Sequence, residues 1–591
     1  MRTTNNYHFP EPMANLNTTL NKTNTYDTIV IGSGMSGGWA AKEFCEKGLK
    51  TLVLEKGRMV NHIEDYPTMM QDAWDMEHRG ALTPEDREKY HIQIRSGFVG
   101  ESVKHFFTND IDNPYQETKR FDWIRGNHVG GRSLTWGKHV YRWSEHDFEA
   151  NAREGIAIDW PIRYKDIAPW YSYVEKFVGV SGEKLGLAHL PDGEFLPPME
   201  LNCLEKHFRK EVEEKFKGRH VTIGRVAHLT EPQPQHLELG RGKCQNRNRC
   251  SRGCPYGAYF SSNSATLPAA NRTGNFAIRP NSIVHSLIYD EKTGGAAKGK
   301  AKGVKVIDSE TNKEIEFFAK IIFVCASTLA STQILLNSTS NRFPNGMGND
   351  SGELGHNLMD HHYHVGAMGS YDGMEDQYYK GRKPTGVFIP KYVNIDDSSK
   401  NPNFLRGYDY QSAGGGRGDW GRGNGIEGVG ASFKDSLFKP GGWGMGLMGF
   451  GEVLPYYENK VTLSKDKTDK WGIPQLVFDA ELKDNEWKMR EKMKSDAAEM
   501  LEKAGFKNVK MFDNVGGLGN GVHEMGTARM GKDPKTSVLN AHNQLHAVPN
   551  VFVTDGACMT SANCVNPSIT YMALTARAVD FAVNELNRKN L

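Results

Sequence analysis

The chain has 591 residues, a length typical of an enzyme with one or two large hydrophobic cores. Its 73 Lys and Arg residues nearly balance its 71 Asp and Glu residues, and the net charge of +2 argues against a nucleic-acid-binding protein. No run of about 18 apolar residues occurs, so no membrane span of its own is predicted. The 63 glycines exceed the average share, whereas 8 cysteines are too few for a disulfide scaffold of this size.

The first folded unit is predicted to begin at Tyr26. Residues 1–25 are polar and lack the apolar segment of a signal peptide, so we expect a loosely ordered arm there. Residues 26–32 have the composition of a short buried parallel strand, residues 38–47 are typical of a helix, and residues 50–55 of a second strand. Together these segments predict one βαβ unit.

A glycine turn joins the first strand to the helix, with Gly32, Gly34 and Gly37 spaced as G-x-G-x-x-G and Ser36 beside the last of them. The first glycine permits a tight turn, the second lets the backbone approach a pyrophosphate, and the third lets helix and strand pack closely. The helix N-terminus then offers free N–H groups to phosphates. Glu55 ends the second strand, where a carboxylate would accept hydrogen bonds from ribose hydroxyls. The pattern predicts a dinucleotide site, the alternative being a glycine turn without a ligand; NAD and FAD both fit the turn, and its position at the start of the fold favours FAD.

Further elements of the same type recur along the chain. Residues 283–320 alternate as in a strand meander, residues 321–326 form a buried strand followed by a helix over 331–337, residues 487–504 have helical spacing, and residues 551–555 and 568–586 form a last strand and a closing helix. Dinucleotide-type elements therefore occur at the start, middle and end of the chain. We predict that the stretches between them fold as a second domain inserted into the first.

Residues 414–451 are rich in glycine and contain Trp420, Trp443 and Phe450. Such a segment suits a lid over a sugar, whose C–H faces stack on aromatic rings; a disordered loop without ligand contact is the alternative. Glu452 and Tyr457 follow and could face the site, although nothing in the sequence orients them.

Three of the cysteines, Cys244, Cys250 and Cys254, fall within eleven residues and end in a Cys-Pro pair. Thiolates at such spacings are typical of iron–sulfur ligation, and three ligands suit a [3Fe-4S] cluster or a four-iron cluster with a ligand of another type. A disulfide, reduced thiols and zinc are the alternatives, although zinc usually takes four ligands. The surrounding loop is basic, which would raise the potential of a cluster or dock an acidic electron acceptor, unless it is only a solvated run of charge.

Five segments resemble the glucose–methanol–choline (GMC) oxidoreductase family. They occur in the family's order and the match spans about residues 26–585; the segments are NHVGGRSLTW at 127–136, ASTLASTQILLNS at 326–338, GHNLMDH at 355–361, HEMGTARMG at 523–531 and NPSIT at 566–570. The resemblance implies a mixed α/β (α+β) fold of the GMC and pyranose oxidase type. An FAD-binding Rossmann-like domain (26–140, 240–360 and 510–591, with the cysteine loop at 240–260) would carry an inserted sheet-plus-helix substrate-binding domain (141–239 and 361–509).

The resemblance also implies the residues that hold the flavin. Gly130, Gly131, Ser133 and Thr135 lie in the flavin-contacting loop, and Asp555 with Gly556 would contact the ribityl chain or the phosphates, unless they only form a turn. Pyranose oxidase-like relatives carry a histidine in this loop that bonds covalently to the flavin. Thr135 occupies that position here, so we expect non-covalent FAD.

Alcohol oxidation needs a base that removes the hydroxyl proton as the hydride leaves, and histidine has a suitable pKa. The resemblance places this base at His523, which follows the glycine-rich residues 516–521. It places Asn566 at the second catalytic position, where an amide would orient the substrate oxygen near the flavin. Structural roles for both residues are the alternative.

Within the family the chain looks most like the large subunits of bacterial gluconate, fructose and glucoside dehydrogenases, on the segments LPYYEN at 454–459 and KWGIP at 470–474 and on the cysteine loop. This branch implies oxidation of a sugar hydroxyl, with glucoside 3-dehydrogenase as the first choice, and electron transfer through an iron–sulfur cluster to a cytochrome c. A small subunit carrying the export signal would take the enzyme to the periplasm; a cytoplasmic location is the alternative. Rival interpretations are a pyranose or glycoside oxidase that uses oxygen, gluconate or fructose specificity, and an inactive flavin-holding subunit.

Overall fold

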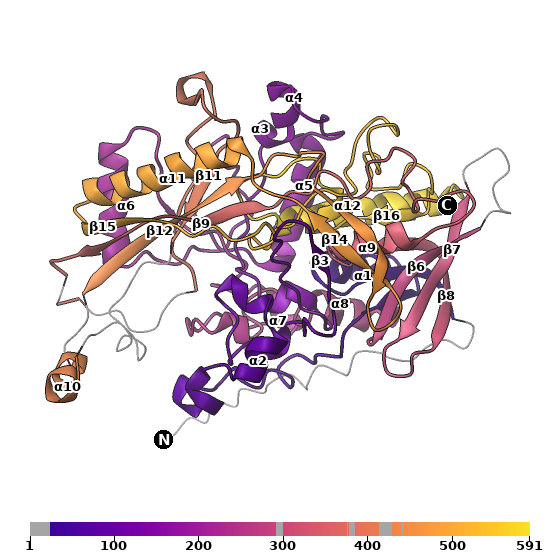
Figure 1. Cartoon of the computed structure of the whole chain (residues 1–591), viewed down its shortest axis with the longest axis horizontal. Coiled ribbons are helices and arrows are strands. Elements are labelled where there is room, and N and C mark those ends of the chain that lie inside the picture. The colour runs from indigo at the N-terminus through magenta and orange to yellow at the C-terminus, as the bar shows by residue number, and fades with distance from the viewer. Residues whose placement is uncertain (1–23, 291–298, 375, 378–383, 413–427, 439–441) are drawn as a thin grey trace.

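The structure is a computed structural model that describes residues 24–290, 299–374, 376–377, 384–412, 428–438 and 442–591. Figure 1 shows two main bodies, with the β6–β8 strands at one end of the long axis and the β9, β12 and β15 strands at the other. The predicted N-terminal arm lies almost wholly outside the described residues, and so do Trp420 and much of the glycine-rich segment.

The first body is built on a seven-stranded sheet with the order β5-β2-β1-β8-β7-β6, to which β16 adds beside β8. Strand β1 pairs in parallel with β2 and with β8, whereas β6, β7 and β8 form an antiparallel meander. These pairings confirm the predicted βαβ unit, meander and last strand. The strands are β1 (Thr25–Ile31), β2 (Thr51–Leu54), β5 (Phe276–Arg279), β6 (Ser282–Asp290), β7 (Lys300–Asp308), β8 (Glu314–Val324) and β16 (Val551–Val553).

Helices cover this sheet because their apolar faces share its core. Helix α1 (Met35–Glu46) packs on α8 (Thr266–Arg272) and on α12 (Ser568–Asn587), while α9 (Thr328–Asn337) lies against β6. None of the described helices is long and apolar enough to cross a membrane. The shorter helices are α2 (Pro84–Lys89), α3 (Glu145–Phe148), α4 (Ala150–Glu154), α7 (Pro234–Glu238) and α10 (Gly430–Phe438).

The second body is a six-stranded sheet with the order β15-β9-β12-β11-β10-β4. Helix α11 (Asp484–Lys503) covers it (Figure 1), because Met489, Met493, Ala497 and Met500 form an apolar stripe at helical spacing. Helix α6 (Cys203–Lys215) shares the same core. The strands are β4 (Thr222–Ile223), β9 (His361–Tyr371), β10 (Val387–Ile389), β11 (Tyr408–Gln411), β12 (Trp443–Glu452) and β15 (Lys507–Asp513).

A third, small sheet lies outside the six-stranded one. It has the order β13-β14-β3, with β13 (Lys460–Thr468), β14 (Pro474–Asp479) and β3 (Gln116–Glu117). The rings of Phe121 and Phe478 stack here with centroids 4.3 Å apart. Residues from the two predicted domains therefore share this sheet.

Helix α5 (Tyr164–Val178) belongs to the first body, although its residues were predicted to fall in the inserted domain. Its apolar face enters the core of the seven-stranded sheet, and Tyr171 hydrogen-bonds Thr570 of α12 at 2.8 Å. The predicted boundary fails because helix periodicity shows which face is buried but not which sheet buries it.

The last part of the glycine-rich segment, from Trp443 on, is a strand rather than a lid, and Gly430–Phe438 before it form helix α10. Strand β12 pairs with β9 and β11, and a Cβ on Gly449 or Gly451 would lie 2.6 Å from Met493 or 2.2 Å from His362. Glycine is needed there because neighbouring side chains fill the space. Trp443 is buried and donates to the carbonyl of Met374 at 2.7 Å.

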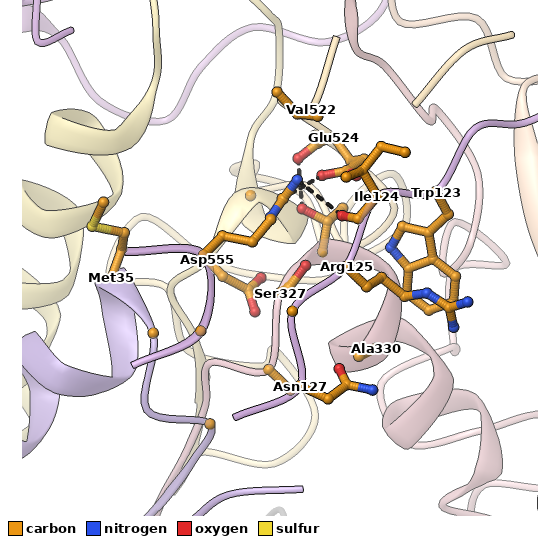
Figure 2. Close-up of a pocket in the computed structure, with 18 of the residues that line it drawn as sticks. Met35, Trp123, Ile124, Arg125, Asn127, Ser327, Ala330, Val522, Glu524 and Asp555 are labelled. Atoms are coloured by element: carbon orange, nitrogen blue, oxygen red, sulfur yellow. Dashed lines mark hydrogen bonds and ion pairs between the residues drawn. The ribbon is translucent and has the colours of Figure 1, made fainter. Parts of the chain in front are cut away.

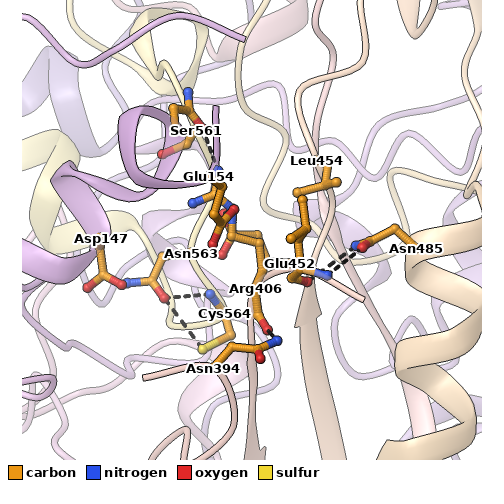
Figure 3. Close-up of polar contacts among 12 residues, drawn as sticks. Asp147, Glu154, Asn394, Arg406, Glu452, Leu454, Asn485, Ser561, Asn563 and Cys564 are labelled. Atoms are coloured by element: carbon orange, nitrogen blue, oxygen red, sulfur yellow. Dashed lines mark hydrogen bonds and ion pairs between the residues drawn. The ribbon is translucent and has the colours of Figure 1, made fainter. Parts of the chain in front are cut away.

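A buried cluster of charged side chains joins the two bodies, and Figure 3 shows Arg406 between Glu154 and Glu452. The Arg406 Nε lies 3.1 Å from Glu154 Oε2 and 3.4 Å from Glu452 Oε1, and Lys391 pairs with Asp147 nearby. Glu452 therefore belongs to this cluster instead of facing the cavity described below, and its burial raises its pKa to about 8. Tyr457 does not line that cavity either; it is exposed and stacks on His356.

Candidate active site

One cavity of about 570 Å³ brings the predicted site residues together. Figure 2 shows part of its wall, with Met35 on one side of the view and Trp123 with Arg125 on the other. His523 lines this cavity together with predicted residues from both ends of the chain: Gly32, Gly34, Ser36, Glu55, Gly131, Ser133, Thr135, Asp555, Gly556 and Asn566.

The glycine turn between β1 and α1 has the tight geometry that its spacing predicts. Gly32 has φ +92°, and a Cβ on Gly37 would lie 1.9 Å from the Gly32 carbonyl oxygen. Gly37 is therefore not part of the cavity wall and instead lets α1 pack against the turn. A Cβ on Gly34 would meet nothing within 4 Å, which leaves the cavity side of the turn open to a pyrophosphate.

Glu55 links this turn to the next one. Its buried carboxylate accepts hydrogen bonds from the Ser33 N–H at 3.1 Å, the Ser33 hydroxyl at 2.6 Å and the Gly57 N–H at 3.0 Å. Burial raises the pKa of this carboxyl group. The Ser33 hydroxyl oxygen in turn accepts from the Gly130 N–H at 2.9 Å, so the two predicted cofactor loops are held against each other.

The second loop places Gly131, Ser133 and Thr135 in the cavity wall. Gly130 is not in the wall; a Cβ there would lie 1.7 Å from the side-chain oxygen of Asn263. Arg132, which the sequence analysis did not single out, also lines the cavity and pairs with Glu524 at 2.7 Å.

The Asp555-Gly556 pair closes the wall near α1. Asp555 accepts from the Ala557 N–H at 3.0 Å and from the Ser331 hydroxyl, and burial raises its pKa to about 6. Ser36 donates to the carbonyl of Thr554 at 3.1 Å. The last strand and the first helix therefore meet at the cavity. A glycine turn open to the cavity at a helix N-terminus, with the buried Glu55 carboxylate in the same wall, fits the dinucleotide part of FAD.

The backbone of the His523 loop is held by Asp360, the residue that precedes β9. The Asp360 carboxylate accepts from the N–H groups of Gly519 at 2.8 Å, Gly521 at 2.9 Å and His523 at 3.0 Å. Burial, aided by the nearby charge of Glu524, raises its pKa to about 7. Three backbone hydrogen bonds to this one buried carboxylate fix the loop that carries the imidazole.

The imidazole of His523 lies between two partners. Its Nε2 is 3.4 Å from the amide nitrogen of Asn566, and its Nδ1 is 3.0 Å from Nδ1 of His361. Burial, the neighbouring His361 and the charge of Arg132 hold the pKa of His523 well below its usual range. The ring is therefore neutral at neutral pH, which is the form that a general base requires.

Gln411 of β11 reaches the same site from the second body. Its amide nitrogen donates to the side-chain oxygen of Asn566 at 2.8 Å, which turns the Asn566 nitrogen toward His523. Sequence reasoning missed Gln411, because only the pairing of β11 in the six-stranded sheet brings it to the cavity.

An aromatic pair forms another part of the wall on the second body. The rings of Tyr363 and Phe450 stack with centroids 5.2 Å apart and an interplanar angle of 18°, and both residues line the cavity. Phe450 was predicted to lie in a lid over a ligand, but it lines the cavity from strand β12. Stacked rings of this kind suit the C–H face of a sugar.

The predicted metal ligands are not arranged as a metal site. Among the described residues, no group of three or more His, Cys, Asp or Glu side chains is placed to hold a metal ion, and Cys244, Cys250 and Cys254 are all free. Burial raises the pKa of Cys244 to about 11 and raises that of Cys250 as well. The arginines of the loop bind a neighbouring segment of the backbone: Arg247 donates to the carbonyl of Met69, and Arg252 donates to the carbonyl of Gln71. The predicted [3Fe-4S] cluster is therefore not supported by this arrangement, and no step below passes through it.

Comparison with known proteins matches residues 233–363 and 455–575 to the two GMC oxidoreductase domains. The chain is 29% identical to 2-methyl-1,2-propanediol dehydrogenase of Mycolicibacterium austroafricanum, over 94% of each chain. It is 23% identical to the fructose dehydrogenase large subunit of Gluconobacter japonicus, over 96% of this chain and 99% of that one. The crystal structure of pyridoxine 4-oxidase from Mesorbium loti shares the fold, with a TM-score of 0.57 and 16% identity over 94% of this chain and 99% of that one.

Both domain matches fall on the segments that build the cavity. The first contains β8, α9 and Asp360, and the second contains His523, Asp555 and Asn566. The chain belongs to the GMC oxidoreductase family, whose members bind FAD and act as enzymes on the CH–OH groups of alcohols and sugars.

Proposed function

We propose that this enzyme is a sugar or glycoside dehydrogenase that oxidises a ring hydroxyl to a ketone, with C3 of a glucoside as the specific position. The observation that carries the proposal is the neutral imidazole of His523 beside the Asn566 amide in a cavity with an aromatic pair in its wall. Sugars present both features that such a wall recognises, a hydroxyl group and an apolar C–H face.

When bound, FAD would supply the acceptor for the hydride, at N5 of its flavin. The chain would hold the pyrophosphate of FAD at the turn with Gly34 and Ser36, and the ribose of FAD at Glu55. The loop with Gly131, Ser133 and Thr135 would contact the flavin. We propose non-covalent binding because Thr135 offers no imidazole; acid precipitation should then release yellow FAD, and flavin kept in the pellet would contradict this.

His523 Nε2 accepts the hydroxyl proton, and Asn566 orients the hydroxyl. The Asn566 nitrogen donates a hydrogen bond, so a substrate oxygen beside it would lie next to Nε2 with its proton directed at the base. Burial and the charge of Arg132 keep the ring neutral, and Asp360 holds the backbone of His523 in place. Deprotonation at Nε2 makes departure of the hydride possible.

We propose that the electrons leave to a separate acceptor protein rather than to oxygen. The proteins compared above include two named dehydrogenases, one of them a large subunit. Ser251 is exposed and also lines the cavity, so the cysteine loop lies where the cavity comes near the surface. Beside the loop, Arg249 contacts the segment of Met70 and Trp74, whose side chains are 60% and 56% exposed. A cytochrome c-type acceptor with an acidic face would dock here.

We propose that a small subunit accompanies this chain and takes it to the periplasm.

The main test is anaerobic incubation of the FAD-loaded enzyme with a panel of sugars and glycosides, followed at the flavin absorbance band, with identification of the keto product. Methyl glucoside should bleach the flavin and yield the 3-keto product. Replacing His523→Ala should slow bleaching by about 10²- to 10⁴-fold while FAD stays bound, because a general base contributes that much. Bleaching of the His523→Ala enzyme at the normal rate would refute the proposal.

The acceptor is tested separately, with cytochrome c and with a small artificial dye. Arg249→Glu should raise the KM for cytochrome c and leave the reaction with the dye unchanged, since only the protein acceptor needs the docking surface. Stoichiometric peroxide formation under air, without added acceptor, would instead identify an oxidase. Iron and labile-sulfide analysis measures directly whether the three thiols carry a cluster.

A further inference from the structure

His361 is the residue nearest to the catalytic site that the proposed reaction does not use. It begins strand β9, directly after Asp360, and its ring lies against that of His523 with centroids 4.8 Å apart and an interplanar angle of 69°. The two Nδ1 atoms are 3.0 Å apart, a normal hydrogen-bond distance between nitrogens. Both rings are buried, so water does not compete for this bond.

The neighbouring side chains determine which ring donates. The amide nitrogen of Gln411 donates to the side-chain oxygen of Asn566 at 2.8 Å. The Asn566 nitrogen therefore faces His523 Nε2, and an amide nitrogen is only a donor. Nε2 of His523 must carry the free lone pair, which leaves its proton on Nδ1.

His361 must then accept at Nδ1 and carry its own proton on Nε2. Among the described residues none accepts from this Nε2 with normal hydrogen-bond geometry. Burial lowers the pKa of His361, whereas the nearby backbone of Asn563 acts in the opposite direction and favours the protonated ring. The arrangement has the order of a catalytic triad, with an imidazole in the place of the usual carboxylate.

We propose that His361 is a positioning residue that sets the tautomer of His523 and takes its Nδ1 proton during substrate oxidation. This inference rests on the proposed role of His523 as the base. When the substrate O–H bond breaks, a new bond forms between that proton and His523 Nε2. The His523 Nδ1–H bond then breaks and an Nδ1–H bond forms on His361, which carries the positive charge. After the product leaves, His523 loses the Nε2 proton to solvent and recovers its Nδ1 proton from His361.

Several charged and titratable groups surround the pair. Arg132 and His139 lower the pKa of His523, and His362, which itself lies beside Arg490, is next to His361. Asp360 and Glu524 are the acidic groups beside the loop. Arg132 is paired with Glu524, so its charge is partly neutralised. A second ring that takes part of the positive charge therefore raises the basicity of His523 Nε2.

The test compares His361→Leu, which removes the acceptor, with His361→Gln, whose side-chain oxygen can accept the Nδ1–H but cannot take the proton. Both are measured as FAD-loaded enzymes by anaerobic stopped-flow reduction, with methyl glucoside and with the panel sugar that reduces the wild type fastest. His361→Leu should slow reduction by about 10- to 100-fold, the loss expected for a hydrogen bond to a group that becomes charged, with little change in KM. In the plot of the reduction rate against pH, the fall in rate at low pH (the low-pH limb) should move to lower pH in His361→Leu, because His523 becomes a weaker base. His361→Gln should recover part of the rate while the limb stays shifted.

His362→Gln is the matched control, because the residue lies on the same strand and its side chain makes no hydrogen bond within the described part of the chain. Its low-pH limb should coincide with that of the wild type. The double variant His361→Leu/His523→Ala should be no slower than His523→Ala alone, since the two residues act as one unit. Additive losses, or a rate that falls only with FAD content while the pH limb stays in place, would overturn the proposal.

A measurement without substrate separates this inference from the proposed function. In an NMR spectrum of FAD-loaded enzyme with ¹⁵N-labelled histidine, the wild type should show the resonance of a proton shared between two ring nitrogens. This proton resonance should be absent from both His361→Gln and His523→Ala. Its persistence in His361→Gln would refute the dyad even if the enzyme oxidised sugars as proposed, whereas its loss in an enzyme that oxidises no sugar would leave the dyad standing and refute the function.

Discussion

The third glycine of the dinucleotide turn offers the sharpest test of the fold around the cofactor site. In Gly37→Ala the new Cβ would lie 1.9 Å from the Gly32 carbonyl oxygen and 2.7 Å from its carbon. Backbone atoms must therefore separate by about 1 Å or more before an ordinary contact is reached. Helix α1 cannot move away freely, because it is packed between α8 and α12. Overpacking of a rigid core costs about 1–3 kcal/mol, and we expect the upper end here.

Gly34→Ala is the matched control in the same turn. Its Cβ would meet nothing within 4 Å, and its φ of −70° suits alanine. The polypeptide should keep its stability, but the methyl group would occupy the side of the turn where the pyrophosphate approaches. Gly37→Ala should therefore lose both stability and FAD affinity, whereas Gly34→Ala should lose FAD affinity alone.

The assay is thermal unfolding followed by circular dichroism, on apoprotein and at increasing FAD, with flavin content measured from absorbance. The Gly37→Ala apoprotein should unfold about 2–3 °C below the wild type, and the Gly34→Ala apoprotein at the wild-type temperature. FAD should raise the midpoint of the wild type more than that of either variant, because stabilisation by a ligand grows with the logarithm of its affinity. A Gly37→Ala protein with the wild-type midpoint and full flavin content would refute the packing argument.

Two further predictions concern residues that the second body contributes. Gln411→Leu removes the 2.8 Å bond to Asn566 and should lower kcat/KM by about 2- to 12-fold, the effect of one ordinary hydrogen bond, with His523 still able to act; an unchanged kcat/KM with the best panel sugar would contradict this. Burial raises the pKa of Glu452 from 4.5 to about 8, so the folded state holds this proton more tightly than the unfolded state. The resulting contribution to the free energy of unfolding is complete below pH 4.5 and is lost as the pH rises to about 8. Glu452→Gln should therefore unfold at a higher temperature relative to the wild type as pH increases through this window, and parallel curves of midpoint against pH would show that Glu452 is not the titrating group.

The cysteine loop illustrates how far spacing can be interpreted. The spacing of three cysteines within eleven residues shows only that three sulfur atoms are close along the chain. Metal ligation also requires that the loop turn the three sulfur atoms toward one point. In the structure the intervening arginines bind the backbone of residues 69–71, and no metal-binding group forms within the part of the chain that is described. The same loop still contributes to the cavity wall through Ser251, a position that no spacing rule indicates.

The amino-acid sequence by itself determined the local parts of this protein. The βαβ unit, the glycine turn, the strand meander and the closing helix follow from patterns within about 30 residues, because hydrophobic periodicity and glycine placement act over that range. The five GMC segments also placed His523 and Asn566, although their separation along the chain says nothing of the distance between them.

Only the tertiary structure decided how those parts combine. It assigned helix α5 to the core of the first sheet, made a strand of the described end of the glycine-rich segment, and buried Glu452 with Arg406 between the two bodies. It also brought Gln411 and His361 to the catalytic pair. These contacts depend on strand order and on packing between segments that lie far apart along the chain. A local sequence pattern does not show which distant surface will cover it.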